Sequence, residues 1–367
     1  MSQRIPVVFN AQQLSTFAAH SGVGTYTRKL LGALAARSDL ELVAMSQPDL
    51  VLPEGVGRLA VRRTKSPPRV SVVEHAAMTP LSLRRGHTKG WVFHNTDFHA
   101  PPLMRAPWVQ TLFDVAPLIL NDEDLTVLRG RWKRFGSRYR RATGVVAISR
   151  HAAAEGVRLL GIDPARIQVA LLGVDPGFRP GAENQGDPPY LLVMGEYSRR
   201  KGFGEAFAVM DALADAGYPH RLVVGGRLRD ESKDELFALR AAARHPDRID
   251  IRGFVPDLVE LYQQASVYLM SSRYEGFGLT ALEAMACGTP VVAFTNSAVT
   301  EVVEGGGQLV ADGDVAAMTA AVRQLLDVPG CREEWRASAI THARTFTWEA
   351  CAAAHAEVFR AAWEDVQ

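Results

Sequence analysis

The sequence has little of what marks several large classes of protein. Its three cysteines, Cys287, Cys331 and Cys351, have neither metal-ligand spacing nor the even number of a disulfide framework. No run of about 18 apolar residues occurs, and the N-terminal stretch becomes polar too soon for a signal peptide. We therefore expect a protein of a reducing cytoplasm that has no integral membrane span.

No charge of one sign is in excess either. The chain carries 41 Lys and Arg against 40 Asp and Glu, a formal net charge of +1. This balance gives no argument for nucleic acid as a partner. Repeats of a fixed short period and low-complexity tracts are also missing from the sequence. A length of 367 residues is sufficient for two domains with full cores.

Short apolar runs alternate with helical segments in both halves of the chain. This alternation predicts an α/β protein with parallel sheets. The expected strands are 5–9, 42–45, 91–94, 108–113, 144–148 and 167–171 in the first half, and 190–195, 222–226, 249–252, 267–270 and 290–294 in the second. Residues 172–189 are dense in Gly and Pro without an apolar period, which predicts a linker between two domains.

The stretch 267–294 has the pattern strand, loop, helix, strand. Gly276 and Gly278 interrupt the first strand, and apolar residues then recur at helical spacing until Gly288 and Pro290 end the helix. In such a unit the free N–H groups of the helix N-terminus lie at the carboxyl edge of the sheet. We therefore expect an anion to bind there.

Two carboxylates, Glu275 and Glu283, flank this expected anion site. Glu275 precedes the helix, and Glu283 lies about 7 Å further along the helix axis. Because carboxylates repel phosphate, we expect them to bind hydroxyl groups, and their separation suits a diphosphate with a sugar on one end and a ribose on the other. The alternative is an ordinary helix with one loop glutamate and one on a solvated face.

Two other turns suit phosphate. Arg199, Arg200 and Lys201 follow the strand expected at 190–195 and precede a helix, at the edge where doubly wound sheets bind ligands. Gly22 and Gly24 occupy the equivalent position after the first strand. A Gly-x-Gly pair alone also fits a simple loop before a helix.

Taken together, the spacing of the two glutamates, the Gly-Phe-Gly break and the run Ala-Met-Ala-Cys-Gly-Thr-Pro-Val-Val resemble the signature of the family 4 retaining glycosyltransferases. The resemblance implies the GT-B fold, in which two Rossmann-like domains have parallel sheets that face each other across a cleft. It implies an N-terminal acceptor-binding domain, 1–178, completed by a C-terminal helix, 350–367. The donor-binding domain would be 179–349.

The resemblance also implies the reaction. A hexose of the mannose or glucose type would move from a nucleoside-diphosphate sugar to an acceptor hydroxyl on a glycan, glycolipid or small molecule, with retention of configuration. Glu275 would bind the sugar hydroxyls and Glu283 the ribose, while Lys201 and Arg200 stabilise the leaving diphosphate without a metal. Further donor-binding residues implied are Gly22, Gly24, Arg199, Gly276, Phe277, Gly278 and Leu279.

The chain departs from the family pattern at two positions. Phe113 stands where many members have a histidine beside the sugar, and Glu196 stands where many have an arginine. Candidates for the acceptor side are Asp114, which could equally cap a helix, and His94 and His99. Two alternatives stay open: a nucleotide-sugar 2-epimerase that uses these acceptor-side groups as acid and base, and a non-catalytic subunit that binds the donor.

Two charged segments have no assigned role. Residues 131–141 combine six basic residues with three aromatics, which suits peripheral contact with the inner membrane face, a phosphorylated acceptor, or the solvated face of a helix. The acidic run 122–124 is the one candidate metal patch in the sequence, and we expect it to be solvated surface. No metal or other cofactor is expected.

Overall fold

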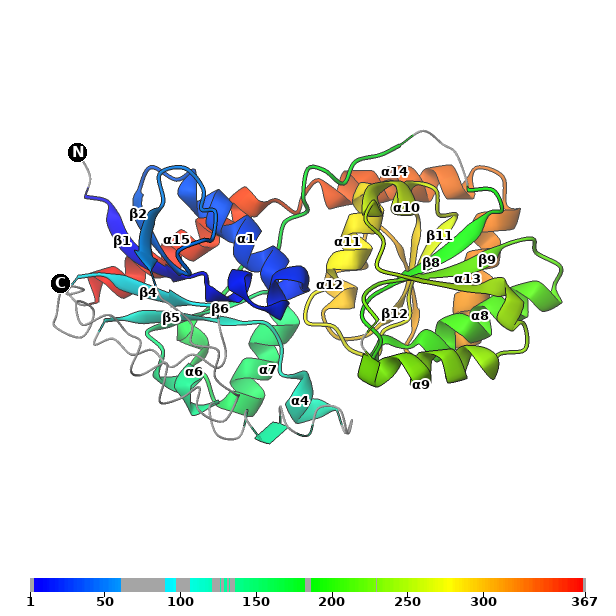
Figure 1. The fold of residues 1–367 in the computed structure, drawn as a ribbon, viewed down its shortest axis with the longest axis horizontal. Helices are drawn as coiled ribbons and strands as arrows, with labels where there is room; N and C mark the ends of the chain where they lie inside the picture. The colour runs from blue at the N-terminus through cyan, green and yellow to red at the C-terminus, as the bar shows by residue number, and fades with distance from the viewer. Residues whose placement is uncertain are drawn as a thin grey trace. The chain divides into compact units, whose positions relative to one another are not determined.

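The computed structural model describes residues 3–60, 90–96, 106–120, 126, 129–130, 132, 136–181, 186–228 and 230–365. The chain divides into two compact units, which are drawn in Figure 1. Unit 1 comprises Met1–Leu118, Val127–Gly173 and Thr347–Gln367, and unit 2 comprises Ile119–Thr126 and Val174–Phe346.

Unit 1 is built on a seven-stranded parallel sheet of order β3-β2-β1-β4-β5-β6-β7. Its strands are β1 (Ile5–Asn10), β2 (Leu40–Ser46), β3 (Gly57–Ala60), β4 (Val92–Asn95), β5 (Trp108–Leu112), β6 (Gly144–Ala147) and β7 (Ile167–Val169). The strand order reverses between β1 and β4, which makes their carboxyl ends the place where such sheets bind ligands. The central strands are almost entirely buried because helices cover both faces of the sheet, and β4 and β5 contain the buried polar residues His94, Asn95, Gln110 and Thr111.

Helices pack on this sheet, and they precede and follow its strands along the chain. They are η1 (Gln12–Ser15), η2 (Phe17–His20), α1 (Gly22–Ala35), α4 (Ala116–Ile119), α6 (Ser137–Arg141), α7 (Arg150–Leu160), η4 (Pro164–Arg166) and α15 (Trp348–Glu364). Ser149 caps α7 by accepting a hydrogen bond from the N–H of Ala152 at 3.0 Å, and Gly161 ends the helix in the left-handed region. Although α15 lies at the C-terminal end of the sequence, it packs against α1 and β6 (Figure 1).

Unit 2 repeats the plan with a six-stranded parallel sheet of order β10-β9-β8-β11-β12-β13. Its strands are β8 (Tyr190–Met194), β9 (Arg221–Gly225), β10 (Ile249–Gly253), β11 (Val267–Met270), β12 (Val291–Thr295) and β13 (Gln308–Ala311). The order reverses between β8 and β11, so the carboxyl ends of these two neighbouring strands form the expected ligand-binding edge of unit 2.

Helices cover both faces of the second sheet. They are η5 (Arg199–Lys201), α8 (Phe203–Asp215), α9 (Asp230–Ala241), η6 (Pro246–Arg248), α10 (Leu258–Gln263), α11 (Leu279–Ala286), α12 (Val299–Val303), α13 (Val315–Asp327) and α14 (Cys331–Ala343). Val267 and Leu269 of β11 pack in the core with residues of α8 and α13, whereas Tyr268 between them contacts α10 and α11 on the other face of the sheet. Successive side chains of β11 therefore pack against the helix layers on opposite faces of the sheet.

The α/β class with parallel sheets is confirmed, and the edge strands β3 and β13 are additions to the predicted set. The two units meet in sequence at Gly173 and Val174, whereas the resemblance placed the boundary at 178. A Cβ on Gly173 would lie 2.2 Å from the backbone N of Trp348, so this glycine allows the chain to pass against the start of α15. That helix begins at Trp348, capped by Thr347, rather than at 350.

Candidate active site

The carboxyl ends of β8 and β11 bring three predicted residues together. Glu275 follows β11 and is 7% exposed. Its Oε1 accepts hydrogen bonds from Lys201 Nζ at 2.6 Å and from Ser272 Oγ at 2.6 Å, and its Oε2 lies 3.4 Å from Arg200 Nη1. Both cations come from η5, the turn after β8. Because β8 and β11 are neighbours at the point where the strand order reverses, residues far apart in sequence meet there.

A glycine makes this close approach of η5 and β11 feasible. Gly202 has φ +65°, and a Cβ at this position would lie 1.9 Å from the carbonyl oxygen of Ser271. The N–H of Arg273 also donates to the carbonyl oxygen of Arg200 at 2.8 Å. Backbone contacts thus fix the two cations relative to Glu275.

The charges in this cluster stabilise one another. Burial would raise the pKa of the Glu275 carboxyl, but the Lys201 ammonium and the Arg200 guanidinium hold it at about 2. Glu275 is therefore ionised at neutral pH and can only accept hydrogen bonds. With two cations and one carboxylate, the cluster carries a net positive charge, which suits an anionic ligand.

Arg199 occupies a different environment from its two neighbours in η5. Its Nε pairs with Glu235 of α9 at 2.9 Å, and both side chains are exposed. This contact directs the guanidinium toward α9 rather than toward Glu275. The role of Arg199 in donor binding stays a prediction, whereas Arg200 is the arginine that lies beside Glu275 together with Lys201.

The N-terminus of α11 lies next to Glu275 in sequence. Gly278 precedes the helix with φ +110°, a conformation that favours glycine, and the first N–H groups of an α-helix have no acceptor within it. Phe277 is buried and packs edge-on against Phe346, so only its backbone is available to a ligand. Gly276 and Leu279 are half-buried. This strand-to-helix turn thus presents backbone N–H groups beside two cations.

Glu283 lies in the second turn of α11 and differs electrostatically from Glu275. It is half-buried, and its Oε2 accepts a hydrogen bond from Tyr262 Oη of α10 at 3.0 Å. Burial raises the pKa of Glu283 to about 7, the Tyr262 hydrogen bond works in the opposite direction, and the nearby Asp175 raises the pKa further. One glutamate of the pair is fully ionised at neutral pH, and the other titrates there.

Ser272 and Tyr262, which donate hydrogen bonds to the two glutamates, are not among the residues predicted from the sequence. Ser272 lies three residues before Glu275, a spacing at which a turn can bring a hydroxyl to a carboxylate, and this signal was available in the sequence. Tyr262 is distant in sequence from Glu283 and resembles any aromatic core residue, so only the packing of α10 on α11 reveals its role.

Two family models match the two halves of the chain. The model described as "Glycosyltransferase Family 4" matches residues 20–178, and the model described as "Glycosyl transferases group 1" matches residues 177–342. The chain belongs to the family 4 glycosyltransferases of group 1.

The relatives of this glycosyltransferase include two mannosyltransferases. O-antigen chain mannosyltransferase B of Escherichia coli is 35% identical over 167 residues, which cover 44% of this chain and 43% of the relative. GDP-mannose-dependent alpha-(1-6)-phosphatidylinositol dimannoside mannosyltransferase of Mycobacterium tuberculosis is 35% identical over 44% of this chain and 42% of the relative. The chain thus matches less than half the length of either relative.

A solved structure resembles the glycosyltransferase over nearly its whole length. Sucrose-phosphate synthase from Thermosynechococcus elongatus superposes with a TM-score of 0.79 at 21% identity, over 97% of this chain and 98% of that one. The likeness identifies the fold, and together with the two parallel sheets it confirms the GT-B architecture.

In unit 1 of this glycosyltransferase, the predicted glycine loop is part of a helix. Gly22 and Gly24 lie in the first turn of α1 rather than before it. A Cβ on Gly24 would lie 2.3 Å from the carbonyl oxygen of Ala18, so glycine is needed there for η2 to pack on α1. Packing therefore accounts for Gly24 without a ligand.

Asp114 performs the structural role that the sequence left open. Its Oδ1 accepts a hydrogen bond from the N–H of Ala116 at 2.9 Å, at the start of α4. The preceding Phe113 packs edge-on against Tyr26, with ring centroids 5.0 Å apart. The side chain at position 113 therefore makes an aromatic contact with α1.

His94 lies in the core and not at a ligand-accessible edge. Its side chain is 0% exposed and belongs to a chain of hydrogen bonds with Thr111, Tyr26 and His355. His355 Nδ1 lies 2.8 Å from the carbonyl oxygen of Cys351, which can only accept. The proton must therefore be on Nδ1, and Nε2 accepts from Tyr26.

The direction of the remaining hydrogen bonds follows from that assignment. Tyr26 Oη accepts from Thr111 Oγ1, which accepts from His94 Nε2. Burial lowers the pKa of both imidazoles, to about 4 for His355, so both are neutral. The structure therefore contradicts the expectation that His94 contacts an acceptor. His99 and the run 122–124 lie outside the described residues.

The described part of the basic segment 131–141 separates into two faces. Trp132 and Tyr139 are buried and stack, with ring centroids 5.4 Å apart, whereas Arg140 and Arg141 are exposed. Within the residues that the structure describes, no helix is long and apolar enough to cross a bilayer. No group of three or more His, Cys, Asp or Glu side chains in those residues is arranged to hold a metal ion.

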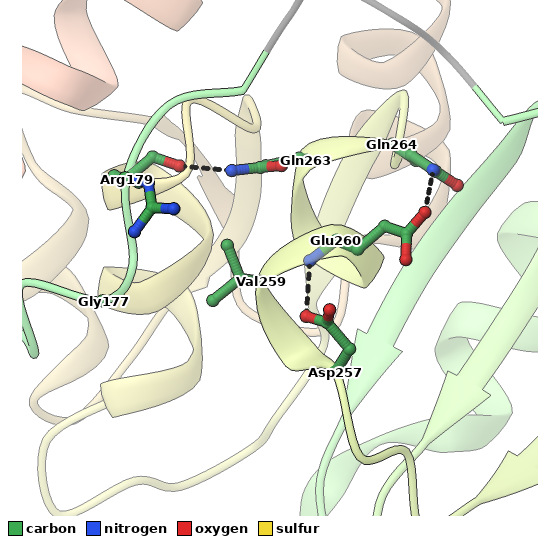
Figure 2. Close-up of a pocket in the computed structure, with 7 residues that line it drawn as sticks. All are labelled: Gly177, Arg179, Asp257, Val259, Glu260, Gln263 and Gln264. Atoms are coloured by element: carbon green, nitrogen blue, oxygen red, sulfur yellow. Dashed lines mark hydrogen bonds between the residues drawn. The ribbon is translucent and has the colours of Figure 1, made fainter.

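A surface pocket of about 530 Å³ lies beside α10 (Figure 2). It is lined by Gly177, Arg179, Asp257, Val259, Glu260, Gln263 and Gln264. Its polar groups largely satisfy one another: Gln263 Nε2 donates to the carbonyl oxygen of Arg179, and Gln264 Nε2 donates to Glu260. None of the predicted donor residues lines it, so the candidate active site remains the cluster around Glu275.

Proposed function

We propose that the protein is a retaining hexosyltransferase that moves a mannose- or glucose-type sugar from a nucleoside diphosphate to an acceptor hydroxyl. The observation that carries this proposal is the contact of Glu275 with Lys201 and Arg200 beside the N-terminus of α11. The Glu275 carboxylate, which can bind hydroxyl groups, therefore lies in direct contact with the two cations that can bind a diphosphate.

Each group has a step to perform. Breaking the bond between sugar and phosphate develops negative charge on the diphosphate, and Lys201, Arg200 and the N–H groups of α11 would stabilise that charge. Glu275 would bind hydroxyls of the sugar, and Glu283 would bind the ribose. The departing phosphate oxygen would take the proton of the acceptor hydroxyl. We propose that no divalent metal takes part, because fixed cations and N–H groups supply the charge.

The names of the relatives point to a first donor. Both relatives are mannosyltransferases, and one is named as GDP-mannose-dependent. GDP-mannose is therefore the donor we propose to test first, with UDP- and dTDP-hexoses beside it. The acceptor classes to test are glycans, glycolipids and small natural-product scaffolds.

Peripheral contact with an anionic membrane surface at the cytoplasmic face is part of the proposal. The exposed Arg140 and Arg141 at the end of α6 support it, since basic side chains bind anionic headgroups. Co-sedimentation with vesicles of anionic or neutral lipid tests this contact. Equal binding to both vesicle types would contradict it.

The epimerase alternative loses support from the structure. Two of its three candidate acid or base groups, His94 and Asp114, lie in the core and at a helix start, respectively. The alternative of a non-catalytic donor-binding subunit is separated from a transferase by experiment.

The experiment incubates the protein with each donor, with and without acceptors, and measures released nucleoside diphosphate and the anomeric configuration of the product. We expect release to depend on an acceptor and the configuration to be retained. Donor binding without release would indicate the non-catalytic subunit, and an altered free nucleotide sugar would indicate the epimerase. Lys201→Ala serves as the control that should abolish release.

A further inference from the structure

Ser297 has a backbone conformation that is unusual for its residue type. It follows β12 with φ +42°, and in the part of the chain that the structure describes it is the one residue other than glycine with a positive φ. A residue with a Cβ is strained in this region, because its side chain approaches the backbone too closely. Such a conformation persists when surrounding contacts hold it, so the contacts of Ser297 are informative.

The hydroxyl of Ser297 is bonded on both sides. Its Oγ accepts a hydrogen bond from the N–H of Glu275 at 2.9 Å and donates to Asn296 Oδ1 at 2.9 Å. The direction is fixed, because an N–H can only donate and the hydroxyl has one proton. Ser297 thus connects the backbone of Glu275 to the side chain of the preceding asparagine.

Asn296 continues this connection to the other end of the same segment. Its Nδ2 donates to the carbonyl oxygen of Ser272 at 2.9 Å and to Asp312 Oδ1 at 2.6 Å. The two residues after β12 therefore bind segment 272–275 at its first carbonyl and at its last N–H. Asp312, which follows β13, accepts one of these hydrogen bonds and thereby helps to fix the side-chain amide of Asn296.

Segment 272–275 has no regular secondary structure of its own. Its shape decides where the Glu275 carboxylate lies, and that carboxylate makes two contacts of 2.6 Å, to Lys201 and Ser272. Small backbone displacements would lengthen both. Since hydrogen bonds weaken steeply with poor geometry, the cluster depends on whatever fixes this segment.

We propose that Ser297, supported by Asn296, is a positioning residue that holds the backbone of Glu275 so that its carboxylate meets the donor sugar. The hydroxyl acts through Glu275 and does not itself contact substrate. The effect on sugar transfer rests on the proposed function, whereas the effect on the Glu275 backbone does not.

The test compares two replacements at one position with a neighbouring control. Ser297→Ala removes the hydroxyl, and Ser297→Gly removes the hydroxyl while accepting the positive φ. The control is Thr295→Val, because Thr295 Oγ1 donates to the carbonyl oxygen of Val310 and not to segment 272–275. The measurements are donor kinetics and amide hydrogen exchange over residues 272–276.

We expect both Ser297 variants to lose about 10- to 100-fold in kcat with a KM for the donor close to that of the wild type, because misplacement of a group near the reaction affects the chemical step. Exchange at the Glu275 amide should be faster in both, and Thr295→Val should match the wild type. If Ser297 only maintained its own backbone conformation, Ser297→Gly would keep the kcat of the wild type and only Ser297→Ala would have a lower kcat.

Full kcat in Ser297→Gly, or unchanged exchange at Glu275 in both variants, would overturn the proposal. The exchange measurement requires no turnover. If the wild type transfers no sugar with any donor, the proposed function fails, and the protection of the Glu275 amide still decides whether Ser297 positions it.

Discussion

Replacing Glu275 with glutamine should tighten the binding of nucleoside diphosphate while it lowers turnover. The carboxylate neutralises part of the charge on Lys201 and Arg200, to which it lies within 2.6 and 3.4 Å. Gln has nearly the same volume and no charge, so Glu275→Gln leaves two cations facing an incoming diphosphate in place of a net single charge. Because the pKa of Glu275 is about 2, the wild type carries the negative charge at every pH suitable for an assay.

The magnitude follows from distances at Lys201. A phosphate oxygen bound to Nζ at about 2.8 Å, on the side away from the carboxylate, would lie roughly 5 Å from Glu275. Repulsion between unit charges at that separation is about 1 kcal/mol in bulk water and about 3 kcal/mol at an effective dielectric constant of about 20. We therefore expect affinity for GDP or UDP to rise about 10-fold in Glu275→Gln.

Turnover should change in the opposite direction. An ionised carboxylate strengthens its hydrogen bonds to sugar hydroxyls as positive charge develops on the sugar, and an amide cannot do so. We expect kcat to fall about 100-fold, the size of loss seen when one group that stabilises transition-state charge is removed. A variant that binds nucleoside diphosphate more tightly but transfers sugar more slowly would show that the cations bind the diphosphate and that the carboxylate acts on the sugar.

Calorimetric titration with GDP and UDP, beside initial-rate kinetics, measures both effects. Glu155→Gln is the matched control, because it removes the same charge from an ion pair within α7 of unit 1, where Glu155 Oε2 lies 2.5 Å from Arg158 Nη2. Melting curves of the free proteins establish that each variant is folded. Weaker or unchanged diphosphate binding by Glu275→Gln would refute the reasoning, since it would show that the carboxylate does not compete with phosphate for the cations.

Three further predictions concern pH and metal. The pKa of Glu283 is about 7 in the folded protein against an ordinary 4.5, so the folded state keeps a proton that the unfolded chain releases, and stability falls as pH rises from about 4.5 to 7. In urea melts, Glu283→Gln should be more stable than the wild type at pH 8 by up to about 3 kcal/mol and should match it near pH 4.5; a constant difference would contradict this. The pKa of His355 is about 4 against an ordinary 6.5, so the unfolded chain takes up a proton first and stability falls as pH drops below about 6.5. Between pH 7 and 5 the wild type should lose about 2 kcal/mol more than His355→Gln, and parallel losses would exclude His355 as the cause. Sugar transfer should be unchanged in excess EDTA, and a loss of rate that magnesium or manganese restores would show that the cations of η5 do not suffice.

The sequence predicted the sheets and one edge of the site because these depend on local patterns. Apolar runs of four to six residues give strands such as β8 and β11. Once both are placed in one parallel sheet, the turns that follow them must share an edge. The meeting of Lys201 with Glu275 could therefore be inferred without coordinates.

Predictions failed where the environment of a side chain depends on distant packing. His94 lies at the carboxyl end of β4, as a ligand-binding residue would, but α15 covers it with His355 and Phe359. The opposite pKa shifts of Glu275 and Glu283 likewise arise from groups on other elements. A pattern in the chain can locate a glutamate, whereas its charge state depends on what packs around it.

The position of α15 has a consequence for the order in which the protein acquires its structure. Trp348, Phe359 and the residues between them help to close the core of unit 1, yet they follow all of Val174–Phe346 along the chain. During synthesis, residues Val174–Phe346 of unit 2 leave the ribosome as one uninterrupted stretch. Unit 2 can therefore fold while unit 1 still lacks α15. The side chains around Tyr26 that pack against α15 stay exposed to water or chaperones until α15, which carries His355, has been translated. Ribosome-bound nascent chains that end at Phe346 and continue into an unstructured spacer long enough to clear the exit tunnel should therefore show a protease-resistant unit 2 attached to a protease-sensitive unit 1.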